Sequence, residues 1–178
     1  MARSHSEPAT VRFYQLAAMP LETALLGIVG KAWERGIRIN LLAGDGAQAQ
    51  RLDDLFWIQP PFLPHGLWNG PDPEQQPLLI SLEPDLRNQA TLLVLATPRL
   101  LPESGGVAMI IDFLPGHDPA ALARGRDRYR HYRSLGCRME YWQQNPRGGW
   151  QLHGQQDATR PDQAASQLIE DVAGNNCK

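Results

Sequence analysis

Cysteine is scarce in this sequence, and long apolar runs are missing altogether. The two cysteines, Cys137 and Cys177, lie far apart and neither belongs to a CxxC pair, which argues against a disulfide framework or a zinc site. No stretch approaches the roughly 20 consecutive apolar residues of a membrane span. The first ten residues, MARSHSEPAT, lack the apolar core of a signal peptide. The composition therefore predicts a reduced, cytoplasmic protein with no membrane partner.

The chain also lacks an excess of charge of one sign. Its 17 basic and 19 acidic residues give a net charge of −2, whereas a protein that follows nucleic acid over a long surface is usually basic. The 178 residues are enough for one α/β domain with a sizeable core and a tail. We therefore expect any positive charge that matters to be local.

The patterns that carry catalysis are absent or incomplete. No histidine is spaced from another histidine, a cysteine or a carboxylate as metal ligands are, and His65, after Pro64, is expected to make a structural hydrogen bond. The turn Gly44-Asp45-Gly46, followed by Ala49, matches the dinucleotide fingerprint only in part; a tight turn with a helix cap accounts for it. We predict no catalytic residue, no metal ligand and no cofactor. A small nucleotide-binding α/β enzyme that uses this turn is the alternative.

Hydrophobic patterning predicts an α/β fold. Strands are expected at residues 11–16, 37–43, 78–82, 91–96, 107–113 and 138–144, and helices at 20–35, 46–57 and between Asp118 and Gly136. A β-α-β-α beginning is typical of a parallel sheet. We expect three layers: a mostly parallel sheet of five to six strands with helices on both faces, Rossmann-like but without a nucleotide site. This single domain would span 11–152, between a disordered lead-in at 1–10 and a polar, mobile tail at 153–178.

The most informative stretch is 110–138, a buried strand followed by a basic helix. Asp118 is a suitable N-cap, Pro119 suits the first helical position, and Gly136 suits the end. At about 100° per residue, the helix divides into three faces. Leu122, Gly125, Tyr129 and Tyr132 face the core, Arg126, Arg130 and Arg133 form a stripe at its edge, and Arg124, Arg128 and His131 point away.

Aromatic rings flanked by guanidinium groups suit a planar carboxylate, because arginine presents a fork of donors that matches its two oxygens. The simplest alternative is a solvated helix face whose arginines keep the protein soluble. A second alternative is a direct single-stranded-DNA binder that uses the basic helix, although the near-neutral net charge and the lack of exposed stacking aromatics count against it.

The link at residues 58–76 is rich in proline and has no hydrophobic period. Large apolar residues nevertheless begin just before it and continue through it: Trp57, Phe62, Leu63, Leu67 and Trp68. Such groups either fix the loop to the domain or offer an apolar patch to a partner.

Taken together, these stretches resemble the chi subunit family of bacterial DNA polymerase III holoenzyme. The resemblance runs from Phe13-Tyr14 to Tyr141-Trp142. It is carried by five segments in order: RLDDLFW at 51–57, FLPHGL at 62–67, PLLIS at 77–81, IIDFLP at 110–115 and RDRYRHYRSLG at 126–136.

The resemblance implies a non-catalytic accessory subunit associated with the clamp loader. It would bind the acidic C-terminal tail of single-stranded-DNA-binding protein (SSB) and reach single-stranded DNA indirectly, through SSB. Arg126 matches the family's carboxylate-binding arginine, Tyr129 and Arg130 match the next pocket residues, and Leu114 matches the apolar wall. The family's upstream lysine has no clean match. Arg124 is its candidate substitute, and Arg133 completes the predicted tail-binding set.

The resemblance also implies a second partner. In the family the aromatic loop receives the small psi subunit, and a helicase can compete for the same face. Trp57, Phe62 and Leu63 match that surface. The expected state is thus a monomer or a heterodimer with psi or an equivalent clamp-loader or helicase partner.

Overall fold

The protein is described here as a computed structural model covering residues 8–17, 19–59, 62–103, 106–116 and 118–157. The helices are α1 (Leu21–Glu34), α2 (Gly46–Ile58) and α3 (Pro119–Ser134). The strands are β1 (Thr10–Leu16), β2 (Ile39–Leu42), β3 (His65–Leu67), β4 (Leu78–Ser81), β5 (Leu92–Leu95), β6 (Met109–Pro115), β7 (Arg138–Gln144) and β8 (Trp150–Gln156). The α/β fold class is confirmed.

These strands form one sheet in the order β3-β4-β2-β5-β6-β1-β7-β8. Every neighbouring pair is parallel except β7 and β8, which are antiparallel. The described chain thus has eight strands, and the predicted five to six was too low. β3 was missed because three residues in a proline-rich link carry no period, and β8 because it is exposed along almost its whole length, which removes the alternation that marks a half-buried strand.

The predicted domain limits need correction at both ends. Ala9 is buried, and Thr10 pairs with both Met109 and Arg138, so ordered structure begins inside the predicted lead-in. At the other end, β8 pairs with β7 as far as Gln156, so the boundary at residue 152 falls within a strand. The rest of the predicted lead-in, 1–7, and of the tail, 158–178, lies outside the described residues.

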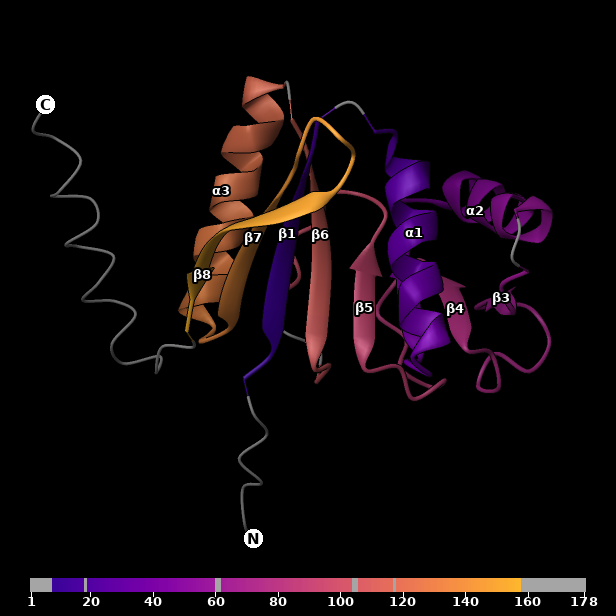
Figure 1. The fold of residues 1–178 in the computed structure, drawn as a ribbon. Coiled ribbons are helices and arrows are strands. Elements are labelled where there is room, and N and C mark those ends of the chain that lie inside the picture. The colour runs from indigo at the N-terminus through magenta and orange to yellow at the C-terminus, as the bar shows by residue number, and fades with distance from the viewer. Residues whose placement is uncertain (1–7, 18, 60–61, 104–105, 117, 158–178) are drawn as a thin grey trace, which may run out of the picture.

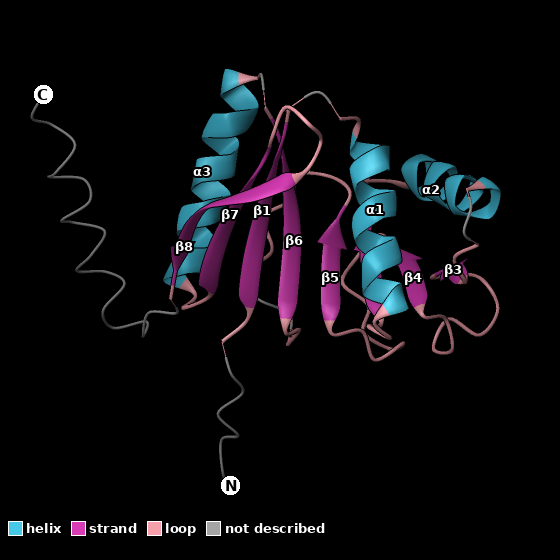
Figure 2. Cartoon of the chain, in the orientation of Figure 1, coloured by secondary structure: helices cyan, strands magenta, loops and turns pink. Residues whose placement is uncertain are grey.

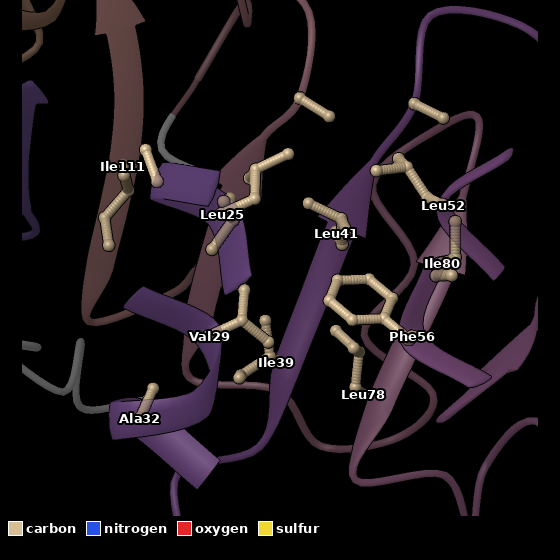
Figure 3. Close-up of a cluster of buried hydrophobic side chains, with 14 of the residues drawn as sticks. Leu25, Val29, Ala32, Ile39, Leu41, Leu52, Phe56, Leu78, Ile80 and Ile111 are labelled. Carbon is tan, nitrogen blue, oxygen red and sulfur yellow. The ribbon is translucent and has the colours of Figure 1, made fainter. Parts of the chain in front are cut away.

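The sheet is covered on both faces, as Figures 1 and 2 show. One face carries α1 and α2, whose Leu25, Val29 and Phe56 pack on Ile39 and Leu41 of the interior strand β2 (Figure 3). The other face carries α3, whose Tyr132 belongs to a second core with Val11 and Phe13 of β1. Alternate residues of β1 enter the two cores because successive side chains of a strand point to opposite faces.

Helix α3 begins and ends where its sequence predicts. The Asp118 carboxylate accepts a hydrogen bond from the Ala120 amide at 2.9 Å, and Pro119 takes the first turn. Gly136 lies just beyond the helix with φ of 81°, a left-handed conformation that glycine adopts at little cost. The helix is thereby fixed beside β6 and β7, where its inner face shapes a pocket.

Candidate functional site

A pocket of about 420 Å³ opens between α3 and the strands β1, β6 and β7. Its lining is mostly apolar and aromatic: Phe13, Gln15, Leu114, Leu122, Gly125, Arg126, Tyr129 and Tyr141. Among the described residues, Arg126 is the single charged member of this lining. Its guanidinium is exposed and forms no ion pair or hydrogen bond with any of the described residues. The pocket therefore combines an apolar floor with one available cation.

Glycine at position 125 sets how closely α3 approaches the pocket floor. A Cβ placed there would overlap the Leu114 side chain, whereas the glycine lets helix and strand come close together. Leu114 is buried. The close approach therefore brings Arg126, next along the helix, to the pocket lined by Leu114.

Two tyrosines on the pocket wall form hydrogen bonds with glutamine side chains of neighbouring strands. The Tyr141 hydroxyl donates a hydrogen bond to Gln15, and the Tyr129 hydroxyl donates one to Gln156 at 3.2 Å. Burial raises the pKa of Tyr141, while the positive charge of Arg126 acts in the opposite direction. The charge of Arg126 therefore acts on the pocket wall at Tyr141.

The structure brings only half of the predicted tail-binding residues together at the pocket. Leu114, Arg126 and Tyr129 line it. Arg124 is exposed with its guanidinium 3.9 Å from Asp118, and Arg130 is exposed and pairs with Asp127 at 3.0 Å. Arg124, Arg130 and the half-buried Arg133 are not among the lining residues. These three arginines lie on α3 but do not form the pocket walls.

The prediction for Arg128 was wrong. It is buried, not solvent-facing, and its Nε and Nη2 donate to the two carboxylate oxygens of Asp112 at 2.6 and 3.1 Å. Burial raises the pKa of Asp112, and the bidentate contact with Arg128 counteracts that effect. A helical wheel places a basic residue outward by default, and it contains no information about an acidic partner on β6.

Sequence reasoning missed Phe13, Gln15 and Tyr141 as pocket residues. They lie in β1 and β7, which pair in parallel with Phe13 opposite Tyr141 although 128 positions separate them. A local pattern can say that these residues alternate between faces. It does not say which strands become neighbours, so no signal within either strand identifies the pocket.

A second candidate surface lies at the end of α2. Trp57 and Phe62 are 59% and 52% exposed, and their ring centroids are 5.4 Å apart. Ile58, which is 74% exposed, extends the patch. Leu63 is only 5% exposed and belongs to the core, so its predicted docking role is corrected to packing. We call Trp57, Ile58 and Phe62 the aromatic patch.

His65 ties the loop beneath the aromatic patch to α2. Its Nδ1 is 2.6 Å from the Leu63 carbonyl oxygen, and its Nε2 is 3.2 Å from the carbonyl oxygen and 3.3 Å from the carboxylate of Asp53. The ring also packs against Phe56 and Trp57. The predicted structural hydrogen bond of His65 is confirmed.

The pocket and the aromatic patch lie at opposite ends of the sheet. The patch lies beside β3, the first strand in the sheet order, and the pocket beside β1 and β7.

Among residues 8–157, as far as they are described, no three His, Cys, Asp or Glu side chains gather as metal ligands would. Within the same part of the chain, no helix combines the length and apolarity needed to cross a membrane. The fold and its surfaces define a small α/β protein with two separate candidate binding sites.

Comparison with known proteins gives the family. The family model described as "DNA polymerase III chi subunit, HolC" matches residues 9–140, and the chain belongs to this family. The chain is also 28% identical over 123 residues to DNA polymerase III subunit chi of Escherichia coli (strain K12), which covers 67% of this chain and 82% of that protein. The predicted family is confirmed, and membership indicates an accessory subunit of the DNA polymerase III assembly.

Proposed function

We propose that this chain recruits SSB to the replicative polymerase by binding the C-terminal tail of SSB in the Arg126 pocket. The observation that carries the proposal is Arg126 itself: an arginine that has no ion pair with the described residues and lies beside a mostly apolar pocket. An arginine in such a place is well suited to a carboxylate, because a charge-assisted bidentate pair is stronger than a neutral hydrogen bond.

The chemistry of the tail complements the pocket and its surroundings in three ways. A chain-terminal carboxylate would pair with Arg126, while the last apolar side chain would enter the space lined by Phe13, Leu114 and Tyr129. The acidic residues before the terminus would be attracted by Arg124, Arg130 and Arg133. Since Arg124 and Arg130 are exposed, we expect their attraction to be modest and screened by salt.

The test is a fluorescence titration with an SSB C-terminal peptide and with the same peptide lacking its last residue. The intact peptide should bind with micromolar affinity and the truncated one should not. Arg126→Ala should weaken binding about 10- to 100-fold, the equivalent of roughly 1.5–3 kcal/mol for a charge-assisted contact. Arg147→Ala, which removes an exposed arginine in the β7–β8 turn, is the matched control. Equal binding by both peptides would refute a carboxylate pocket.

The aromatic patch is proposed as the docking surface for a second protein, the psi subunit or an equivalent clamp-loader or helicase partner. Exposed aromatic residues next to one another are frequent binding anchors, and Trp57 and Phe62 are both more than half exposed. Trp57→Ala should abolish or strongly weaken that complex while leaving the SSB tail titration unchanged. Leu100→Ala, which removes a side chain that is 55% exposed elsewhere, is the control for apolar surface.

In this proposal the subunit acts by binding alone. It has no catalytic site of its own and needs no cofactor, works in the cytoplasm as a monomer or heterodimer, and reaches single-stranded DNA through SSB. Separate loss of each partner with Arg126→Ala and Trp57→Ala would support the two-surface arrangement. Loss of both partners with one variant, in a protein that remains folded, would contradict it.

A further inference from the structure

A second large hollow lies on the face of the sheet opposite α3, between α1 and the β7–β8 hairpin. Figure 1 shows α1 and β8 on the same side of the sheet, with β1 and β6 between them. The hollow has a volume of about 620 Å³, within the usual range of small-ligand sites. Neither proposed binding surface uses it. We call it the α1–β8 groove.

Aromatic rings form one wall of the α1–β8 groove. Tyr14 and Trp142 are stacked, with ring centroids 6.1 Å apart and an angle of 19° between the ring planes. Trp150, at the start of β8, meets Tyr14 edge-on with a centroid distance of 4.7 Å. Both tryptophans are half-buried, so each is accessible in part. This wall can offer ring faces or edges to a planar ligand.

The charged residues of the lining are basic: Arg12, Lys31 and Arg35 line the groove, and none of the carboxylates in the described part of the chain does. Arg12 already has partners within the protein, because its Nε pairs with Glu140 at 2.7 Å and its guanidinium lies over the Trp142 ring. Lys31 and Arg35 are exposed and form no ion pair with the described residues. Two cations therefore remain available beside the aromatic wall.

Lys31 and Arg35 also lie at the C-terminal end of α1, where positive charge stabilises a helix. Their charge alone therefore does not indicate a ligand. The indication comes from combining two available cations with an aromatic wall in one groove, since stacking surfaces along a positive groove are what single-stranded nucleic acids require.

We propose that the α1–β8 groove binds single-stranded DNA, with a base against the Trp142–Trp150 wall and phosphates near Lys31 and Arg35. A free nucleotide has the same chemistry of planar base and phosphate. Single-stranded DNA is the favoured occupant because the two available cations, Lys31 and Arg35, lie about one helical turn apart, which suits the successive phosphates of a backbone.

Gly27 provides a direct way to block the groove. It lines the groove from α1, and a Cβ added there would meet no atom within 4 Å. Gly27→Leu should therefore fill open space in the groove without a clash at Cβ, and leucine is the better helix former. Gly30→Leu is the matched control: its Cβ also meets open space, but Gly30 is not part of the groove lining.

The experiment measures fluorescence anisotropy of a labelled thymidine oligonucleotide with the full chain at low salt. Binding should fall steeply as salt rises. Gly27→Leu should weaken it at least tenfold, and Gly30→Leu should leave it within twofold. Lys31→Ala combined with Arg35→Ala should lower the slope of log affinity against log salt by about 1.4, since each single-strand phosphate contact contributes roughly 0.7.

Three results would overturn the proposal. One is no binding at low salt. Another is binding that Gly27→Leu leaves unchanged in a folded protein. The third is binding that Arg126→Ala abolishes, which would assign the DNA to the basic helix.

Trp150→Ala should weaken binding at least fivefold, as expected for one lost stacking contact. Competition by thymidine monophosphate as effectively as by the oligonucleotide would assign the groove to free nucleotides instead.

Discussion

The Arg126 pocket and the aromatic patch are built in opposite ways. The pocket is a hollow with one available charge, and its walls come from β1, β6, α3 and β7. The patch is an exposed apolar surface at the end of α2, and its residues fall within six consecutive positions, Trp57 to Phe62. The pocket therefore depends on the packing of distant segments, whereas the patch depends on the end of α2 and the short segment that follows it.

This difference predicts different sensitivities. A pocket assembled from several elements should be damaged by changes in the core behind it. A patch carried on a loop should be damaged by loss of the contacts that hold the loop. Single substitutions in the core and at the patch can separate these two kinds of dependence.

Arg128→Ala should destabilise the fold by about 3–5 kcal/mol, because it leaves the Asp112 carboxylate buried without its bidentate partner. Urea unfolding would measure the change. Arg126→Ala, two positions away on the same helix, is the control and should change stability by less than about 0.5 kcal/mol, since its side chain is exposed. Similar losses for the two variants would contradict the distinction between a structural and a ligand-binding arginine.

His65→Ala should cost about 2 kcal/mol and should act mainly on the aromatic patch. The substitution removes hydrogen bonds to Leu63 and Asp53 and leaves a cavity beside Phe56. Second-partner binding should weaken while the SSB tail titration stays within twofold. His153→Ala, at an exposed position of β8, is the control and should change neither quantity. An effect of His65→Ala on tail binding alone would indicate that the two regions are coupled.

Gly125→Ala should weaken tail binding about tenfold and destabilise the fold by about 1 kcal/mol. An alanine inside a helix is normally favourable by up to about 1 kcal/mol over glycine, but here the new methyl would overlap Leu114 and force repacking. Gly30→Ala, whose methyl would meet open space, should instead be stabilising. If both variants were stabilising, the close approach of α3 to the pocket floor would not be required.

The stability of the core behind the pocket should depend on pH in the alkaline range. Burial raises the pKa of Tyr132, and a group whose pKa is higher in the folded state stabilises the fold below its unfolded value, near 10. Stability should therefore fall as the pH rises above about 10. Tyr132→Phe should make this decline shallower, as measured by denaturant unfolding at several pH values. An unchanged slope would mean that other groups dominate the alkaline transition.

The local features of α3 could be predicted because they depend on neighbours in sequence. Asp118 caps the helix and Gly136 ends it through contacts within a few residues. The wheel also identified Gly125 and Tyr132 as buried. It failed at Arg128, because the partner Asp112 is in an otherwise apolar strand 16 positions earlier, and a periodicity argument treats each element in isolation.

The aromatic patch also shows where prediction from local sequence patterns fails. Trp57, Phe62 and Leu63 look alike in the sequence as large apolar residues near prolines. Their positions in the fold differ: Phe62 faces solvent, and the next residue, Leu63, packs in the core with Phe56. Only the path of the chain between α2 and β3 separates an exposed anchor from a buried one.

The sequence by itself determined the fold class, the family, the helix limits and the presence of an arginine-aromatic helix, because these depend on local patterns and on motif order. The tertiary structure decided which arginine is available, which is buried, and that Phe13, Gln15 and Tyr141 complete the pocket. It also brought Tyr14, Trp142 and Trp150 together with Lys31 and Arg35 in one groove. Those outcomes depend on which strands become neighbours, and that is fixed only when distant segments bury their apolar surfaces together.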